Sequence, residues 1–569
     1  MKRITLLVSL VLAALMGSAQ THIDRALQEE MNRRNDDEKV EIMVLMKAQC
    51  DRNQLNRRAE FCSTRAERRD FIVSELKAFA EASQSDLKHS LAEMERLNLV
   101  STPKTLWSAN ALCFSATKSV ILDLAQRTDI GMIGFDHKEN LIPETAAAQP
   151  AAVTRETTPN VYQVNADKVW ELGYRGEGVI VAVVDSGVNY DHLDLAEHLW
   201  DGGVAFPHHG YDIVNGDDDP MDDKGHGTHC AGTVLGNGAA GSLTGMAPDA
   251  TLMCVKSIDA EGFGGSANIA GGMEWSVEHG CDLISMSLGM VNSELPDREL
   301  LRRTCVSILD AGIVAAVCAG NEGHIQFYSP IPNNIRVPAS CPPPYLDADQ
   351  WENSGDLSCV IAVGAVDSNN GAAYFTSHGP VTWTNTEFGD YAYDPGIGLI
   401  RPDLCAPGVA IKSLDYLTTD GYCNLDGTSQ ATPCVAGVIA LMLNKNPELL
   451  PADICRILEE TSVKLTETKS NVTGVGCIDA LAAVNAVEAY DGVNKQSVVA
   501  EAFPNPSDGN FNVVCEDLKQ ISVYSVDGRL VKAFEVNGTQ CCIEGLERGT
   551  YLVQMETERG FVVRKMIVK

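Results

Sequence analysis

Between residues 160 and 490, apolar residues come in short unbroken runs separated by longer stretches with helical periodicity. The runs show no regular alternation of apolar and polar side chains, and they cover residues 179–184, 250–255, 283–287 and 314–317. Strands that are buried on both faces have this pattern, whereas strands with one wet face alternate. Helices are expected between them, at about 266–279 and 293–311. The pattern predicts an α/β fold with a mainly parallel sheet covered by helices, in which chemistry gathers outside the carboxyl ends of the strands.

The stretch before this core has a different pattern. A long charged segment with helical periodicity spans about residues 65–97, and strand-like runs lie at 40–46, 106–116 and 130–135. Short strands mixed with helices in this way predict a small α+β unit over residues 20–150.

The last part of the chain, residues 497–569, is rich in short β-type runs. Asp527–Gly528 and Asn537–Gly538 are dipeptides that favour tight hairpin turns. A stretch of this length and pattern predicts a small β-sandwich. The runs cover residues 521–525, 530–534, 551–555 and 561–568.

The N-terminus has the pattern of a targeting segment. Lys2 and Arg3 precede an apolar run from Ile4 to Met16, and small residues follow as far as Ala19. This order is typical of a secretory signal peptide over residues 1–19. A membrane-spanning helix needs about 18 or more apolar residues, and no later run reaches that length. We therefore expect an exported protein, secreted or associated with the cell surface.

The composition is that of a folded chain and excludes one class of partner. A length of 569 residues implies several domains, and 45% hydrophobic residues with 21% charged residues exclude a disordered protein. The net charge of -33 excludes nucleic-acid binding, which needs a basic surface. Eighteen cysteines in an exported chain permit disulfides, and the loop between Cys341 and Cys359 makes that pair the favoured bridge.

Four polar residues stand where the predicted strands end or the predicted helices begin. Asp185 ends the first buried run, His226 begins a helix, and Asn321 follows the last of the four runs. Ser429 stands at the start of an apolar helix, where Pro433 is tolerated because first-turn amides have no partner within the helix. Each could be a cap or a turn former. Together they supply an acid, a base, an amide donor and a nucleophile, which are the parts that acyl transfer requires.

Two other kinds of hydrolase site are excluded by single residues. A zinc-protease helix needs His-Glu-x-x-His, but only Gly227 and Thr228 separate His226 from His229. The nucleophile elbow of α/β-hydrolases needs Gly two positions after the serine, where this chain has Ala431. We therefore interpret His229 as a buried structural histidine.

The order Asp, His, Ser is one of three unrelated orders in which this triad occurs. With the sequences around these residues, it resembles the subtilisin-like (subtilase) serine proteases over about residues 160–490, within a catalytic domain of residues 151–492. The resemblance implies a subtilisin-like core in which Asp185 orients His226, the general base and acid. Ser429 would be the nucleophile. Asn321 would donate its side-chain amide to the oxyanion, beside the backbone N–H of Ser429.

The same resemblance implies a binding site for extended peptide. Ser287, Leu288 and Gly289 would form the strand that pairs with substrate. Together with this strand, Ala319 and Gly320 would wall the S1 pocket, which receives the side chain before the scissile bond.

Two features near His226 have open interpretations. The acidic run at residues 217–223 invites a structural calcium ion, which subtilases often bind, but it lacks the EF-hand spacing and a solvated loop is favoured. No metal ligand is assigned, and the implied chemistry requires no cofactor. Cys230 resembles the free cysteine beneath the catalytic histidine of the proteinase K branch.

The N-terminal unit also carries a resemblance. Residues 107–115 and 133–136 resemble the inhibitory propeptide of subtilases, which implies that residues 20–150 act as an intramolecular inhibitor. Residues 145–159, rich in Ala, Thr and Pro, predict an exposed linker, and self-cleavage is expected within residues 145–162.

Residues 497–569 resemble a type IX secretion sorting domain, which implies a partner in the machinery that carries proteins from the periplasm across the outer membrane. A plain β appendage or a carbohydrate-binding module is the alternative. The residues that carry the resemblance are Phe503-Pro504-Asn505-Pro506, Gly509-Asn510-Phe511, 523–529, 549–553 and 565–569.

We expect a secreted serine endopeptidase that is made as a zymogen and hydrolyses protein or peptide substrates through an acyl-enzyme. The alternative is a non-catalytic surface binding protein on a protease fold.

Overall fold

The computed structural model describes residues 22–143, 148–291, 295–343, 360–383, 398–488, 500–503, 505–507, 509–525, 529–557 and 560–569. The chain divides into two compact units, residues 1–50 with 69–490, and residues 51–68 with 491–569. The predicted signal peptide, Cys359 and the predicted turn at Asp527–Gly528 lie outside the described residues. Within the described ranges, no helix is both long enough and apolar enough to cross a membrane.

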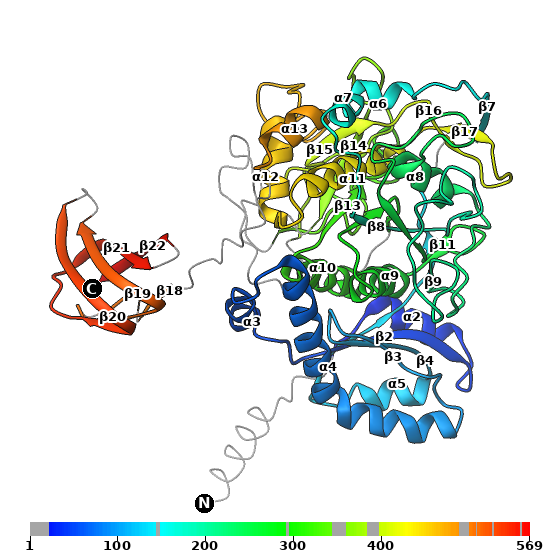
Figure 1. Cartoon of the computed structure of the whole chain (residues 1–569). Coiled ribbons are helices and arrows are strands. Elements are labelled where there is room, and N and C mark those ends of the chain that lie inside the picture. Colours follow the sequence, from blue (N-terminus) through cyan, green and yellow to red (C-terminus); the bar gives the residue numbers. More distant parts are fainter. Residues whose placement is uncertain are drawn as a thin grey trace, which may run out of the picture. The chain divides into compact units, whose positions relative to one another are not determined.

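A seven-stranded sheet forms the centre of the first unit, in the order β15-β14-β13-β12-β8-β10-β9 (Figure 1). Every neighbouring pair in it is parallel, which confirms the predicted α/β core. Its strands are almost fully buried, as expected for a sheet covered on both faces. The strands are β8 (Ile180–Asp185), β9 (Gly210–Asp212), β10 (Thr251–Lys256), β12 (Leu283–Met286), β13 (Val314–Cys318), β14 (Ile361–Val366) and β15 (Leu404–Pro407).

Helices cover the two faces of this sheet. On one face, α11 (Thr428–Lys445) packs against β12 to β15 and against α8 (His226–Leu235). On the other face, α9 (Ser266–Glu278) and α10 (Leu295–Asp310) pack side by side (Figure 1). The two helices predicted from periodicity are α9 and α10, although residues 292–294 are not among those described. The remaining helices of the core are α6 (Pro159–Gln163), α7 (Ala166–Glu171), α12 (Pro451–Thr461) and α13 (Ala480–Ala486).

Short strands join the edges of the core. β16 (Ile411–Leu414) and β17 (Tyr422–Leu425) form a hairpin, and β7 (Gln149–Ala151) pairs antiparallel with β17. β6 (Glu139–Asn140) pairs antiparallel with β11 (Phe263–Gly264). Both β6 and β7, which come before the core in the chain, are thus hydrogen-bonded to strands of the core.

The N-terminal part of the first unit is an α+β unit with a five-stranded sheet in the order β1-β5-β2-β4-β3. The turn at Trp107–Asn110, where Asn110 has φ of 48°, splits the predicted strand at 106–116 into β3 and β4. α9 contacts β3, and α10 contacts β2 and β5, so one face of this sheet lies on the core (Figure 1). The elements are β1 (His22–Ile23), α2 (Arg25–Arg33), β2 (Lys39–Met46), α4 (Arg65–Arg96), β3 (Lys104–Leu106), β4 (Ala111–Thr117), α5 (Lys118–Leu124) and β5 (Ile130–Phe135).

The second unit comprises α3 (Arg52–Ala59) and an antiparallel β domain. The sequence predicts a small β-sandwich here, and the strands form an antiparallel β domain. The predicted turn at Asn537–Gly538 is wrong, because both residues lie within β20. The pairing of β19 with β20 shifts register between Val514 and Leu518, and such an irregularity accommodates a turn-type dipeptide without ending the strand. The strands are β18 (Ala500–Phe503), β19 (Phe511–Ser525), β20 (Leu530–Ile543), β21 (Gly549–Thr557) and β22 (Gly560–Val568).

Candidate active site

The fold brings the four predicted active-site residues together from four separate elements. Asp185 is the last residue of β8, and His226 is the first residue of α8. Asn321 follows β13, and Ser429 lies in the first turn of α11. Hydrogen bonds link these elements at the carboxyl edge of the parallel sheet, as the sequence pattern predicted.

Asp185 and His226 form a buried hydrogen-bonded pair. His226 Nδ1 lies 2.8 Å from Asp185 Oδ1, which also accepts the backbone N–H of Ser186 at 2.8 Å. Burial by itself would lower the pKa of His226, but the negative charge of Asp185, the neighbouring Cys230 and the hydrogen bonds raise this pKa well above its ordinary value. An imidazole held this way is oriented by Nδ1 and presents Nε2 to a substrate.

Glycine lets α8 begin directly against the end of β8. A Cβ atom on Gly227 would lie 2.1 Å from the carbonyl oxygen of Gly187 and 3.0 Å from the Cβ of Asp185. Any larger residue would push the helix away and separate His226 from Asp185. The glycine after His226 is therefore a requirement of the acid–base pair.

The Ser429 hydroxyl points at the substrate strand in this structure. Its Oγ donates to the carbonyl oxygen of Ser287 at 3.3 Å, and Ser429 is fully buried. His226 Nε2 is buried and has no hydrogen-bond partner among the described residues. The Ser429 hydroxyl and the His226 imidazole are thus not hydrogen-bonded to each other in this structure.

Pro433 explains the environment of the Ser429 backbone. It was expected near the first turn of the helix, but it stands five residues after Thr428, in the helix interior. There, a residue with an N–H would donate to the carbonyl oxygen of Ser429, and proline cannot. That oxygen instead accepts the hydroxyl of Ser287 at 2.7 Å and lies 3.5 Å from the sulfur of Cys230.

The side chain of Asn321 is fixed by the start of α11. Its Oδ1 accepts both the backbone N–H and the hydroxyl of Thr428, each at 3.0 Å. The Thr428 hydroxyl in turn accepts the N–H of Gly320 at 3.1 Å. Because the amide is planar, holding Oδ1 on Thr428 turns the NH₂ group of the buried Asn321 to the opposite side.

The predicted substrate strand is occupied by the chain's own N-terminal segment. The N–H of Gly289 donates to the carbonyl oxygen of Leu141 at 2.9 Å, and the N–H of Leu141 donates to the carbonyl oxygen of Gly262 at 3.0 Å. With β6 on β11, the segment at 139–141 lies between β11 and the residues that follow β12, since β12 ends at Met286 and the predicted strand at 287–289 is not part of it. Sequence reasoning found one of these two flanking segments and missed the other, whose signal is the glycine-rich stretch at 262–265.

Three interpretations of cysteine and histidine residues can be compared with the structure. His229 is fully buried, its Nε2 contacts the carbonyl oxygen of Ile411 at 3.1 Å, and burial lowers its pKa to about 3, so it is a structural histidine. Cys230 lies beneath the imidazole, with its sulfur 3.9 Å from His226 Nδ1. Cys341 is buried, and its predicted partner Cys359 lies outside the described residues.

The acidic run at 217–223 is used by the protein itself. Asp222 is buried and accepts the backbone N–H groups of Lys224, Gly225 and Thr228, so it holds the start of α8. Asp223 pairs with Lys256 at 2.6 Å. Two carboxylates of the run thus bind protein groups, and no calcium ligand is assigned in it.

Comparison with known proteins identifies two regions of the chain. Residues 176–476 match the Subtilase family, and residues 501–569 match the Secretion system C-terminal sorting domain. The second match shows a type IX sorting domain, which directs the protein to secretion or the cell surface. The match therefore identifies these residues as a sorting domain and excludes the alternative of a plain β appendage.

Three relatives illustrate the first match. Serine protease AprX of Bacillus subtilis (strain 168) is 34% identical over 335 residues, covering 54% of this chain and 66% of that protein. Subtilisin DY of Bacillus licheniformis is 32% identical over 305 residues, covering 54% and 91%. Subtilisin E of Bacillus subtilis (strain 168) is 31% identical over 358 residues, covering 63% and 76%. The parallel core, the buried Asp185–His226 pair and these matches together show that the chain belongs to the subtilase family of serine proteases.

Proposed function

We propose that this protein is a secreted endopeptidase, made as a zymogen, that cleaves proteins through an acyl-enzyme on Ser429. The observation that carries the proposal is the 2.8 Å hydrogen bond between Asp185 and His226 beside the N-terminal turn that bears Ser429. An acid, a base and a serine assembled in this way suit acyl transfer.

The chemistry begins when a peptide carbonyl enters beside Ser429. The Ser429 hydroxyl leaves the Ser287 carbonyl, donates to His226 Nε2 and attacks the peptide carbon while the imidazole takes its proton. Asp185 stabilises the imidazolium that forms. His226 then gives the proton to the leaving amine, the C–N bond breaks, and a water activated by the same imidazole hydrolyses the ester.

The oxyanion of each tetrahedral intermediate needs donors that are already in position. The side-chain NH₂ of Asn321 and the backbone N–H of Ser429 are the proposed pair. Asn321 is held from behind by Thr428, and the start of α11 adds the positive end of the helix dipole. Preorganised donors of this kind typically supply about 3 kcal/mol of transition-state stabilisation each.

The N-terminal unit is proposed to be an inhibitor of this site. Its segment at 139–141 takes the place of substrate between Gly262 and Gly289. Its sheet is also anchored on the core: the N–H of Ser108 donates to Glu274 at 2.7 Å, and the Ser307 hydroxyl donates to the Ser108 carbonyl at 2.6 Å. We propose residues 20–150 as the propeptide, 151–492 as the catalytic domain and 497–569 as the sorting domain that is removed after export.

No cofactor enters this mechanism, and the acidic run at 217–223 is not proposed as a calcium site. The second candidate function, a non-catalytic binding protein, is disfavoured because a decayed site would have no reason to keep Asp185, His226, Asn321 and Ser429 together. The test is hydrolysis of a denatured protein by the processed chain. Activity that is present in wild type and absent in Ser429→Ala supports the proposal, and equal activity in both would refute it.

A further inference from the structure

Two hydroxyl groups join the turn that follows Asp185 to the first turn of α8. The Ser186 hydroxyl accepts the backbone N–H of Gly227 at 2.9 Å, so the residue after the acid binds the residue after the base. The Thr228 hydroxyl accepts the backbone N–H of Asn189 at 2.8 Å, in the opposite direction across the same gap. Each hydroxyl therefore bridges the chain that leaves β8 and the start of α8.

A single carboxylate, that of Asp222, orients both hydroxyls. Ser186 Oγ donates to Asp222 Oδ1 at 2.9 Å, and Thr228 Oγ1 donates to Asp222 Oδ2. A hydroxyl has one hydrogen, so donating it to the carboxylate leaves the oxygen to accept an N–H group. Asp222 also accepts the backbone N–H groups of Lys224, Gly225 and Thr228. It belongs to the acidic run for which the sequence favoured a solvated loop, and it is the common acceptor of the two bridges.

The bridges are shielded from water. Ser186 and Thr228 are fully buried, and Asp222 is 6% exposed. Lys256, which is also buried, donates through Nζ to the carbonyl oxygen of Ser186 at 2.7 Å and to Asp223 at 2.6 Å. Ser186 is therefore held at its hydroxyl and at its carbonyl group. A buried N–H group that loses its hydroxyl acceptor stays unsatisfied, which makes each bridge costly to remove.

The Ser186 bridge lies directly beside the acid–base pair. Asp185 precedes Ser186 in the chain and His226 precedes Gly227, so the bridge joins the two neighbours of the 2.8 Å bond between Asp185 and His226. Movement of α8 away from β8 must lengthen that bond. A displacement of about 1 Å in a catalytic group can cost about 10²-fold in rate.

We propose that the Ser186 and Thr228 hydroxyls, both oriented by Asp222, are positioning groups for catalysis. They hold α8 against β8, so that the bond between Asp185 and His226 keeps its length. The inference rests on the proposed peptidase function and adds positioning residues to its site. Burial lowers the pKa of His226 and the charge of Asp185 raises it, so a looser pair has a lower pKa.

Steady-state kinetics of the processed enzyme on one peptide p-nitroanilide tests the proposal, with rates referred to active sites counted with a fluorophosphonate. Ser186→Ala and Thr228→Val should each lower kcat by about tenfold and leave KM within about twofold, because both hydroxyls bind only protein groups. Thr228→Ser keeps the hydroxyl and should restore kcat.

The pH profile gives a readout that a loss of stability alone would not move. Activity needs a neutral imidazole at His226, so the acid limb of kcat/KM should move to lower pH in Ser186→Ala and Thr228→Val. Cys230 and His229 are the other titratable groups beside this imidazole, and both variants leave them in place.

Thr233 provides the matched control on the same helix. It is fully buried, and its hydroxyl donates to the carbonyl oxygen of His229 at 3.1 Å, further along α8 than either bridge. Thr233→Val removes this buried hydroxyl and should keep the wild-type kcat and acid limb.

A second measurement needs no catalysis. Proton NMR of the full-length chain carrying Ser429→Ala observes the Nδ1 proton of His226, whose downfield resonance reports the hydrogen bond to Asp185. Ser186→Ala and Thr228→Val should shift this resonance upfield, whereas Thr233→Val should leave it in place. If Ser186→Ala fails to fold, Thr228→Val carries the test, because valine keeps the shape of threonine.

The proposal is overturned if the hydroxyl-free variants keep the wild-type kcat and acid limb, or if Thr233→Val lowers kcat as much as they do. An unchanged His226 resonance in Ser186→Ala and Thr228→Val also overturns it. A wild-type chain without peptidase activity contradicts the proposed function, and the resonance then still decides whether the hydroxyls position His226.

Discussion

The hydroxyl of Ser287 donates a 2.7 Å hydrogen bond to the carbonyl oxygen of Ser429. This bond exists because Pro433 has no N–H to occupy the same oxygen within α11. It joins the predicted substrate strand to the turn that bears the nucleophile. The backbone of Ser429, the proposed nucleophile, is thereby positioned by the segment that is proposed to receive the peptide.

A double-mutant cycle tests this arrangement. Ser287→Ala should destabilise the protein by about 1–3 kcal/mol, because a buried carbonyl loses its best donor. Pro433→Ala offers a helix N–H to the same oxygen, so Ser287→Ala should cost less in that background. Urea unfolding of the four proteins, all carrying Ser429→Ala to prevent self-digestion, measures the coupling. Strictly additive free energies of unfolding would show that the two residues do not share this acceptor.

Asn321 should act on the rate and leave substrate binding nearly unchanged. Asn321→Ala removes one oxyanion donor and should lower kcat by about 10²–10³-fold with little change in KM. Thr428→Val removes the hydroxyl that helps to hold Oδ1 of Asn321 and should lower kcat by a smaller factor. Steady-state kinetics on one peptide substrate distinguishes the two. A rise in KM with constant kcat would assign Asn321 to ground-state binding.

Activation of the zymogen should depend on pH through the interface between the N-terminal unit and the core. Burial raises the pKa of Glu274 from 4.5 to about 8 where it meets Ser108, Lys104, Cys113 and Glu278. The docked form therefore binds a proton that the separated form has lost, so docking is favoured at low pH and weakens as pH rises from 4.5 to 8. We expect precursor activation to accelerate over pH 6 to 8.

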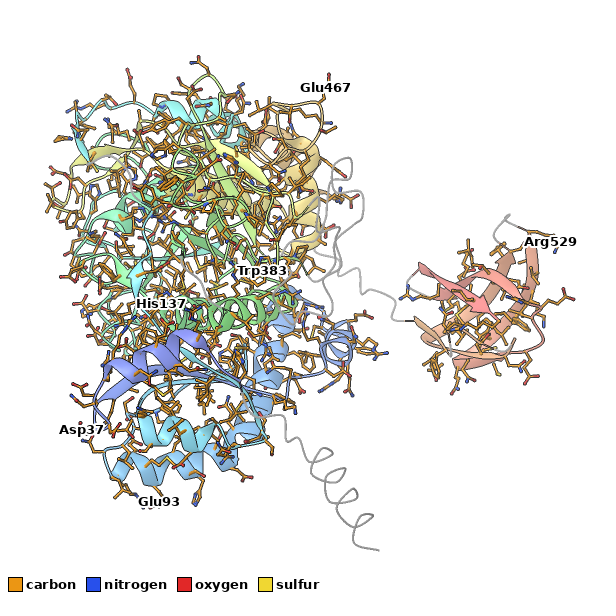
Figure 2. All side chains as sticks on the ribbon, turned by 180° about the vertical axis from the view of Figure 1, so that it is seen from behind. Asp37, Glu93, His137, Trp383, Glu467 and Arg529 are labelled. Carbon is orange, nitrogen blue, oxygen red and sulfur yellow. The ribbon has the colours of Figure 1, made fainter. Side chains whose placement is uncertain are left out.

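The pKa values of two neighbouring groups, Asp136 and His137, are also raised, so their titration weakens docking with rising pH, as that of Glu274 does. The pKa of Asp136 is raised by burial to about 6, and the nearby carboxylates of Glu139 and Asp297 raise the pKa of His137 to about 9. His137 lies where the N-terminal unit meets α9 and α10 (Figure 2). Glu274→Gln should flatten the pH dependence of activation, while Glu467→Gln, at an exposed position away from this interface, is the control (Figure 2). An unchanged slope in Glu274→Gln would exclude Glu274 as the titrating group.

The precursor should be cut close to the segment that fills the groove. Leu141 is held by Gly262 and Gly289, and β7 at 149–151 is already part of a core sheet. We expect the mature N-terminus within the predicted 145–162 interval. N-terminal sequencing of the processed protein checks the position. Ser429→Ala should remain full length, and normal processing of that variant would assign the cut to another protease.

The sequence could predict the parts whose pattern is local. Buried runs without alternation gave the parallel sheet, and Asp185, His226, Asn321 and Ser429 stand at strand or helix ends that the pattern already marked. The small unit at 20–150 was predicted as α+β for the same reason. What remained hidden depends on contacts between distant segments. The Trp107–Asn110 turn breaks a strand because Ser108 bonds to α9 and α10, and nothing local to residues 106–116 indicates this.

Other differences have similar causes. Asn537–Gly538 is a turn sequence that a register shift keeps within a strand. Pro433 was expected in the first turn, but its effect in the helix interior appears only when Ser287 is placed beside Ser429. Arg336 stands in a loop without periodicity, so its bonds to Gly289 and to the segment at 140–141 appear only in the folded chain.

The central claim is that Ser429 is a nucleophile activated by His226 and Asp185. The processed protein is treated with a fluorophosphonate, and the adduct is located by peptide mass spectrometry. The account predicts one equivalent of label on Ser429, with labelling abolished in Ser429→Ala and slowed in His226→Ala. The kcat of Ser429→Ala should fall by about 10⁶-fold, a magnitude established for subtilisin. Failure to label Ser429, or equal labelling of wild type and His226→Ala, would contradict it.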